Sequence, residues 1–153
     1  QNRPERVQAV LPALEAWVRA AQQASGVGPA ATALVGFSQG AICALELAQA
    51  EDGLAGRVLA FAGRYATLPL HAPRHTTLHL FHGAEDPVIP VRYARVAMQR
   101  LEREGAVLPA RLVQIPPTWP LAVSGHGIRA TGVLGWSQEW QILHAPAPPP
   151  AGP

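Results

Sequence analysis

Apolar positions repeat with a helical period in three segments of the chain. Residues 6–24 carry an apolar side chain every three or four positions, and residues 90–104 carry a similar stripe opposite charged side chains. Residues 41–48 are apolar on almost every side, which is typical of a buried helix. We expect Gly26 and Gly28 to end the first helix, and Pro12 to mark a kink or a later start within it. The expected buried face of this helix consists of Val7, Val10, Leu11, Leu14, Trp17, Val18 and Ala21.

Four short apolar runs predict strands between and after these helices. They cover residues 31–35, 57–63, 76–83 and 111–115. Strands that alternate with helices predict an α/β domain with a mostly parallel sheet and helices on both faces. No regular pattern follows residue 128, and residues 145–153 are rich in Pro and Ala. We therefore expect one α/β domain over residues 1–130 and an irregular Pro-rich tail over residues 131–153.

A Gly-x-Ser-x-Gly motif, Gly36-Phe37-Ser38-Gln39-Gly40, joins the first predicted strand to the apolar helix. In this context the motif predicts a nucleophile elbow, a sharp turn that holds a serine in a strained backbone conformation. The two glycines are expected to remove side chains that would otherwise collide across the turn. The Ser38 hydroxyl would then stand at a helix N-terminus, where backbone N–H groups favour negative charge. The alternative is a Gly-rich turn with an ordinary capping serine.

A serine nucleophile needs a base, and the base needs a carboxylate to orient it. Asp52 follows the apolar helix in a Glu-Asp-Gly turn, where aspartate is ordinary turn chemistry. Asp86 and its neighbour Glu85 follow a buried strand, and both are candidates for the acid. His126 lies between two glycines, on a segment predicted to be a flexible loop, and is the candidate base.

Four further histidines pose a rival hypothesis, because they recur every three or four residues, the spacing of a metal-binding stripe on a helix. Prolines interrupt the segment, and its second half reads as a strand, on which these side chains would point to opposite faces. The sequence therefore argues against a metal site at His71, His75, His79 and His82.

Charge and composition narrow the partners. The 12 basic residues are all arginine, and they are balanced by 10 acidic residues to a net charge of +2. They are spread along the chain, apart from four on one predicted helix, Arg92, Arg95, Arg100 and Arg103, which alternate with Glu102 and Glu104 as on a solvated helix face. This pattern argues against nucleic acid as the partner. No run reaches the roughly 18 apolar residues of a membrane span, and the N-terminus does not resemble a signal peptide, so we expect a cytoplasmic protein. Cys43 is the only cysteine and is expected to be a small buried side chain rather than a second nucleophile.

Three motifs in order resemble the phospholipase/carboxylesterase family, a group of α/β-hydrolases that includes acyl-protein thioesterases and bacterial carboxylesterases. They are the Gly-Phe-Ser-Gln-Gly-Ala elbow, the segment from His82-Gly83 through Asp86-Pro87-Val88-Ile89-Pro90, and Gly125-His126-Gly127-Ile128. The resemblance covers about residues 1–128. It implies Ser38 as nucleophile, Asp86 as acid, His126 as base and the Gln39 backbone N–H as an oxyanion-hole donor. It also implies hydrolysis of carboxylic esters or thioesters without a metal or organic cofactor.

The chain departs from the family pattern in three places. Nothing before Gln1 corresponds to the early strands or to the Leu-His-Gly-like loop that supplies the second oxyanion donor. The segment of residues 116–120 is richer in proline than the family pattern, and a Pro-rich tail stands where the family continues into a closing helix. The resemblance thus implies the C-terminal two-thirds of an α/β-hydrolase domain. The alternative function is that of an inactive fragment that acts only by association with another chain, and homo-oligomer formation is left open.

Overall fold

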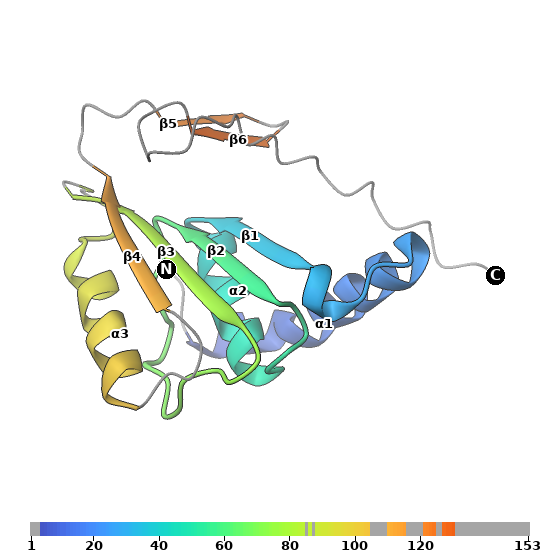
Figure 1. Cartoon of the computed structure of the whole chain (residues 1–153). Coiled ribbons are helices and arrows are strands. Elements are labelled where there is room, and N and C mark those ends of the chain that lie inside the picture. Colours follow the sequence, from blue (N-terminus) through green and yellow to red (C-terminus); the bar gives the residue numbers. More distant parts are fainter. Residues whose placement is uncertain are drawn as a thin grey trace.

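The computed structural model describes residues 4–84, 86, 88–104, 110–115, 121–124 and 127–130. Its main sheet has four parallel strands in the order β1-β2-β3-β4 (Figure 1). The elements along the chain are α1 (Pro4–Ser25), a short 3-10 helix η1 (Pro29–Ala31), β1 (Ala33–Phe37), α2 (Gln39–Ala50), β2 (Arg57–Phe61), β3 (Thr77–Gly83), α3 (Arg92–Arg103), β4 (Ala110–Ile115), β5 (Leu121–Ser124) and β6 (Gly127–Ala130). The predicted helices and the four predicted strands are confirmed, and with them the α/β class.

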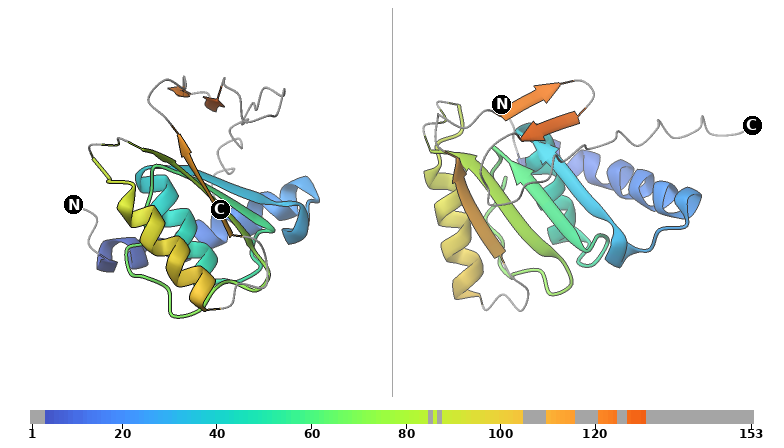
Figure 2. Two further views of the ribbon diagram at one scale, coloured as in Figure 1. Left: turned by 60° about the vertical axis from the view of Figure 1, so that its left-hand side comes forward. Right: turned by 45° about the horizontal axis from the view of Figure 1, so that its top comes forward.

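One face of the sheet carries the hydrophobic core. Val58, Leu78 and Leu80 point to the same side of β2 and β3 and are almost completely buried. Helices α2 and α3 pack on that side, where Leu45 and Leu101 are also fully buried. Helix α1 packs against α2 in a second apolar cluster (Figure 2). The sequence predicted helices on both faces, but the helices in the described part of the chain cover only one.

Helix α1 is continuous through Pro12, so the expected later start of the helix is wrong. A proline inside a helix removes one hydrogen bond and crowds the preceding turn. Val7 and Leu11 are nevertheless buried on one side of this position and Val18 on the other, so packing spans the proline. The helix ends at Ser25, followed by Gly26 in the left-handed region at φ 68°, as its glycines predicted. No helix in the described part of the chain is long and apolar enough to cross a membrane.

Two strands beyond residue 115 were not expected from the sequence. Strands β5 and β6 pair antiparallel in a sheet of their own, with Leu121 opposite Ala130 and Ser124 opposite Gly127. The loop predicted around His126 falls on residues 125–126, which lie outside the described residues, between β5 and β6. The predicted tail of residues 131–153 lies outside the described residues.

Candidate active site

Ser38 occupies the turn between β1 and α2 with φ 52° and ψ −114°, a strained conformation for a residue with a side chain. Its backbone N–H donates to the carbonyl oxygen of Phe61 at 2.8 Å, so the turn is held by the neighbouring strand β2. Ser38 is the N-cap residue of α2, yet its hydroxyl makes no capping hydrogen bond. The hydroxyl is therefore not used by its own helix, which speaks against the alternative of an ordinary capping serine.

Only one of the two motif glycines is required by space within the described structure. A Cβ added at Gly36 would lie 2.3 Å from the carbonyl oxygen of Gly40 and 2.5 Å from the nitrogen of Ala41. The start of α2 therefore approaches β1 too closely for any side chain at position 36. A Cβ added at Gly40 meets nothing within 4 Å. The expectation that both glycines relieve a collision is confirmed for Gly36 and wrong for Gly40.

The turn after β2 is pressed against the same helix end. Ala62 is the other non-glycine residue with positive φ (53°) in the described structure, and its N–H donates to the carbonyl oxygen of Phe81 at 2.8 Å. A Cβ on Gly63 would lie 2.5 Å from the Cβ of Ala41 in the first turn of α2. Two strained turns thus stand side by side at the carboxyl ends of β1 and β2, next to the candidate nucleophile.

The N-terminus of α2 presents free backbone donors beside Ser38. The helix begins at Gln39, and the N–H of Ile42 is the one that donates to the Ser38 carbonyl oxygen, at 3.1 Å. The N–H groups of the three residues before Ile42 precede the first helical donor and have no partner within the helix. The Gln39 N–H, expected as an oxyanion donor, lies in this group. A negative charge on the Ser38 side of the turn would be favoured by these donors and by the helix dipole.

Asp86 lies three residues beyond the end of β3, at the same edge of the sheet as Ser38, since all four strands are parallel. Its Oδ1 accepts hydrogen bonds from the N–H groups of Val88 at 2.9 Å and Ile89 at 3.0 Å. The carboxylate is half-buried and fixed by the loop that follows it. The rival Glu85 lies outside the described residues.

Asp52 serves a different purpose, as its turn sequence predicted. Its two oxygens accept from the N–H groups of Arg74 and His75, each at 2.8 Å. Both carboxylate oxygens are thereby used to tie the α2–β2 turn to the segment before β3. These bonds leave Asp86 as the aspartate at the site.

His126 lies outside the described residues, so its predicted position relative to Ser38 and Asp86 stays a prediction. Among the described residues, His82 is the histidine that the structure places beside Asp86. His82 in β3 is 2% exposed, and its Nε2 lies 3.6 Å from Asp86 Oδ2. Sequence reasoning treated His82 as one of four histidines spaced three or four residues apart and as the start of the second family motif, and gave it no role of its own. Its place on a buried strand directly before Gly83 was the signal that could have singled it out.

The other histidines do not converge. His79 bonds to Arg57 at 3.0 Å on the opposite face of the sheet from the core. Among the described residues, no group of three or more His, Cys, Asp or Glu side chains is placed to hold a metal ion.

A buried carboxylate in α2 holds the loop after β2. Glu46 is 4% exposed, and its Oε1 accepts from the N–H groups of Ala66 at 2.7 Å and Thr67 at 3.1 Å. Burial raises the pKa of the Glu46 carboxyl, and the two hydrogen bonds oppose that shift. Burial, with the Glu46 charge as a smaller cause, also raises the pKa of the Cys43 thiol. A raised pKa keeps a thiol protonated, which argues against Cys43 as a second nucleophile. Its side chain is only partly buried and lines the groove between α1 and α2, so the expected burial is wrong.

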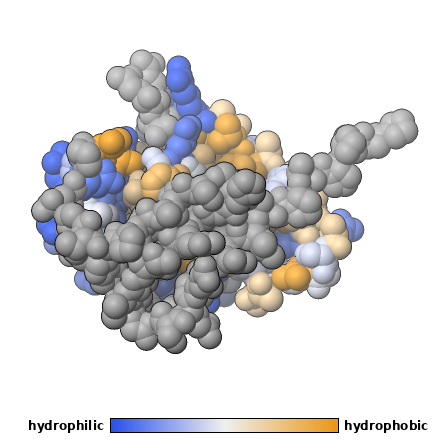
Figure 3. Space-filling view, turned by 90° about the horizontal axis from the view of Figure 1, so that it is seen from above, coloured by the Kyte–Doolittle hydropathy of each residue, from blue (hydrophilic) through white to orange (hydrophobic). Residues whose placement is uncertain are grey.

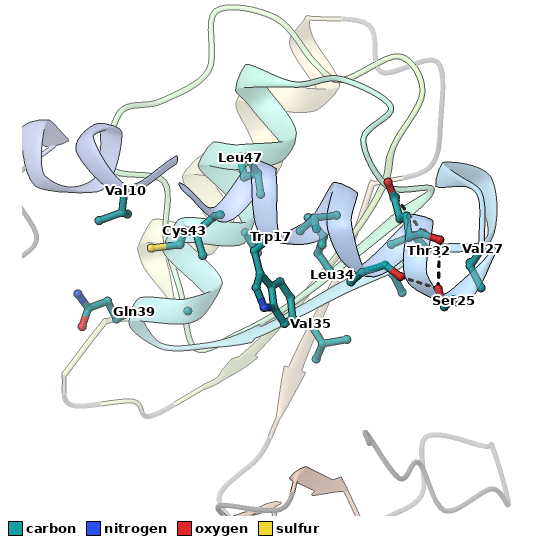
Figure 4. Close-up of a pocket in the computed structure, with 17 residues that line it drawn as sticks. Val10, Trp17, Ser25, Val27, Thr32, Leu34, Val35, Gln39, Cys43 and Leu47 are labelled. Atoms are coloured by element: carbon teal, nitrogen blue, oxygen red, sulfur yellow. Dashed lines mark hydrogen bonds between the residues drawn. The ribbon is translucent and has the colours of Figure 1, made fainter. Parts of the chain in front are cut away.

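An apolar groove of about 770 Å³ runs along the outer edge of β1, between α1 and α2 (Figure 4). One end is formed by Gln39 and Gly40 of the elbow, and the other by Ser25 and Val27 after α1. Trp17, which was expected to be in the core, lines this groove and is 36% exposed. Within the described chain, β1 has a strand partner on one side only.

Figure 3 looks down on the end of the molecule at which the strands finish. Hydrophobic and hydrophilic residues lie interspersed in the coloured part of this surface. Arg64 and Arg92 both stack on the ring of Tyr93, at 5.3 and 5.1 Å from its centroid. These two arginines are therefore held by an aromatic side chain rather than arranged as an open cationic patch.

Comparison with known proteins gives consistent matches. Residues 1–108 match the family model described as Phospholipase/Carboxylesterase. Over 113 residues, 74% of the chain, the sequence is 51% identical to Esterase YpfH of Escherichia coli K12, of which these residues cover 49%. Among solved structures, esterase PE8 is 31% identical with a TM-score of 0.65, over 73% of this chain and 53% of that one. A phospholipase/carboxylesterase from Dyadobacter fermentans is 27% identical with a TM-score of 0.59, over 78% and 58%. The chain thus spans about half the length of the relatives it matches.

Proposed function

The chain belongs to the phospholipase/carboxylesterase family, and we propose that it carries the catalytic centre of a serine hydrolase that cleaves carboxylic esters or thioesters. The fold is that of an α/β-hydrolase, and the named relatives are esterases. The observation that carries the proposal is the strained Ser38 at a strand-to-helix turn whose close packing requires glycine at position 36. Strain of this kind costs about 1–3 kcal/mol and is typical of functional sites.

In the proposed reaction, the Ser38 oxygen attacks the carbonyl carbon of the substrate and forms an acyl-enzyme. His126 accepts the Ser38 proton and passes it to the departing alcohol or thiol. Water then attacks the acyl-enzyme by the same route in reverse and restores the serine. Asp86 orients the imidazole and stabilises its cation, and the Gln39 N–H binds the oxyanion of each tetrahedral intermediate.

The arrangement of the parallel sheet supports this division of roles. Ser38 follows β1 and Asp86 follows β3, so both lie at the carboxyl edge of the sheet, where ligands bind in open α/β folds. Asp86 keeps its carboxylate ordered through two backbone hydrogen bonds to one oxygen. The second oxygen is thereby kept at a defined position, as a partner for an imidazole requires.

The second candidate is a fragment that acts only by association, and the edge of β1 favours it. An unpaired strand edge beside an apolar groove is a surface on which another strand can add. The two candidates differ in one observable, because only the first requires a reactive Ser38.

The test is to label the purified chain with a fluorophosphonate probe and to locate the modified peptide by mass spectrometry. We expect one adduct per chain, on Ser38, that is lost in His126→Ala. Ser25→Ala is the matched control, because Ser25 bonds to helix carbonyl oxygens of α1 and should leave labelling unchanged. Folded protein that forms no Ser38 adduct would refute the proposal for this chain and favour the association candidate.

A further inference from the structure

His82 occupies a place in the core at which an apolar side chain would be expected. It is the residue before the last in β3, and its side chain is 1% exposed. Its neighbours of the same strand face, Leu78 and Leu80, are apolar core residues. A buried imidazole costs free energy unless its polar atoms are hydrogen-bonded. The partners of His82 therefore indicate what the residue is for.

Those partners belong to the loop that carries the acid. His82 Nε2 lies 2.5 Å from the carbonyl oxygen of Ile89 and 3.6 Å from Asp86 Oδ2. A carbonyl oxygen only accepts, so Nε2 bears the proton and donates it to Ile89. The same N–H faces Asp86 Oδ2, the carboxylate oxygen that accepts no hydrogen bond from the described part of the loop backbone. One side chain thus contacts both the end of the loop and the acid within it.

The remaining bonds of the loop close a small ring. The Asp86 N–H donates to the Gly83 carbonyl oxygen at 3.3 Å, and Asp86 Oδ1 accepts from the N–H groups of Val88 and Ile89. The bonds to Asp86 Oδ1 are internal to the loop and define its shape, and the bond to Gly83 joins the start of the loop to the end of β3. The His82 bond to Ile89 joins the far end of that shape to strand β3. Without it, the far end of the loop is held by the packing of the Ile89 side chain in the second apolar cluster, which is not directional and fixes the carboxylate less closely.

We propose that His82 is a positioning residue for the acid: its Nε2–H anchors Ile89 to β3 and so fixes where Asp86 presents its second oxygen. The inference rests on the proposed function, because the position of Asp86 matters for catalysis only if Asp86 orients the base. His82 itself touches neither the nucleophile nor the substrate in this role. It acts through the loop.

The test uses substitutions that place a donor at different points of the same site. In His82→Gln the amide nitrogen reaches about as far as Nε2, whereas in His82→Asn it reaches only about as far as Nδ1. The third variant, His82→Leu, removes the donor and keeps the volume. His79→Gln is the matched control, because His79 lies on the same strand but on the opposite face, away from the acid loop.

The readout is the rate of Ser38 labelling by a fluorophosphonate probe as a function of pH. We expect His82→Gln and His79→Gln to stay within about threefold of the wild type. We expect a loss of about 10²-fold in His82→Asn and His82→Leu, the factor that a misplacement of about 1 Å costs. The acid limb of their pH–rate profile should move to lower pH, because a base without its oriented carboxylate holds its proton less tightly.

Three results would overturn the inference. The first is a wild-type rate of labelling in His82→Leu, and the second is an equal loss of labelling rate in His82→Gln and His82→Asn. The third is a slower His82→Asn or His82→Leu whose pH–rate profile keeps the acid limb of the wild type, which would indicate a purely structural role. If His82→Leu does not fold, the Gln and Asn pair decides. If the wild type is not labelled at all, the proposed function fails for this chain. Hydrogen exchange at the Val88 and Ile89 amides then tests the anchor alone, and equal exchange in the Gln and Asn variants overturns it.

Discussion

The two glycines of the elbow are expected to respond in opposite ways to substitution by alanine. In Gly36→Ala the new Cβ would lie 2.3 Å from the Gly40 carbonyl oxygen and 2.4 Å from its carbon. Atoms of this kind pack at about 3.5 Å or more, so the start of α2 and the end of β1 must separate by roughly 1 Å. Both contacts are backbone atoms, which cannot be relieved by a change of rotamer.

The magnitudes follow from this displacement. Overpacking typically costs about 1–3 kcal/mol of folding stability. A displacement of roughly 1 Å at the nucleophile costs about 10²-fold in rate. Gly40→Ala meets nothing within 4 Å and places alanine in the first turn of α2, where it is favoured over glycine by about 0.5–1 kcal/mol. One variant should therefore lose both stability and labelling, and the other should lose neither.

The assay pairs urea unfolding of each variant with its rate of Ser38 labelling by the fluorophosphonate probe. We expect a lower midpoint and a rate reduced about 10²-fold for Gly36→Ala, with an equal or higher midpoint and an unchanged rate for Gly40→Ala. Equal losses in both variants would refute the reasoning, because they would mean that the motif glycines serve a common need. Wild-type behaviour of Gly36→Ala would show that the close approach of β1 and α2 is not maintained in solution.

Three further predictions concern other parts of the structure. Asp86→Asn keeps an acceptor for the two loop N–H groups, so its unfolding midpoint should stay near that of the wild type while the rate of Ser38 labelling falls by about 10⁴-fold. Asp86→Ala should lower both the labelling rate and the unfolding midpoint. Equal midpoints in the Asn and Ala variants would contradict the role of these hydrogen bonds. Burial raises the folded-state pKa of Glu46, so its contribution favours folding at low pH and is lost as pH rises through that pKa. In urea unfolding across pH 4 to 7, Glu46→Gln should therefore lose less stability than the wild type, and parallel curves would argue against the shift. The hydroxyl of Tyr65 is buried without a hydrogen-bond partner in the described structure, so Tyr65→Phe should raise the free energy of unfolding by about 1 kcal/mol in calorimetry. A decrease would mean that the hydroxyl makes a hydrogen bond in the folded protein.

Local patterns in the sequence were sufficient for the main elements and for the elbow. The strand before Ser38 and the helix after it were readable because one apolar run changes to another across a Gly-flanked serine. The place of Asp86 at the carboxyl edge of the sheet was predictable because it follows a buried strand, whereas its choice over Glu85 came from the resemblance and its role as the acid stays a prediction. Asp52 was correctly read as a turn residue from its neighbours alone. Each of these features depends on residues that are close in sequence.

The features that were missed depend on packing between distant segments. Pro12 suggested a break, but contacts on both sides of it keep α1 continuous. Trp17 and Val10 follow the apolar stripe of α1 yet line an open groove, because β1 carries no strand on that side in the described chain. The His82 contact joins residues that are near in sequence, but its meaning depends on a loop shape that no periodic pattern encodes. The prediction for Gly40 was wrong because the motif is symmetric in sequence, whereas other backbone atoms approach closely only at Gly36.

The all-parallel sheet sets the order in which the nucleophile turn can form. Strand partners in this sheet, such as Ala33 with Arg57 and Arg57 with Thr77, are at least twenty residues apart, so no two neighbouring strands of the described main sheet form a local hairpin. Contacts of this range are slow to form, since chain entropy is lost before any of them is gained. The backbone N–H of Ser38 finds its acceptor only on β2, at Phe61. On a ribosome, Ser38 would therefore be synthesised well before it can take up its strained geometry, and under the proposed function the nascent chain would carry an inert serine until β2 docks.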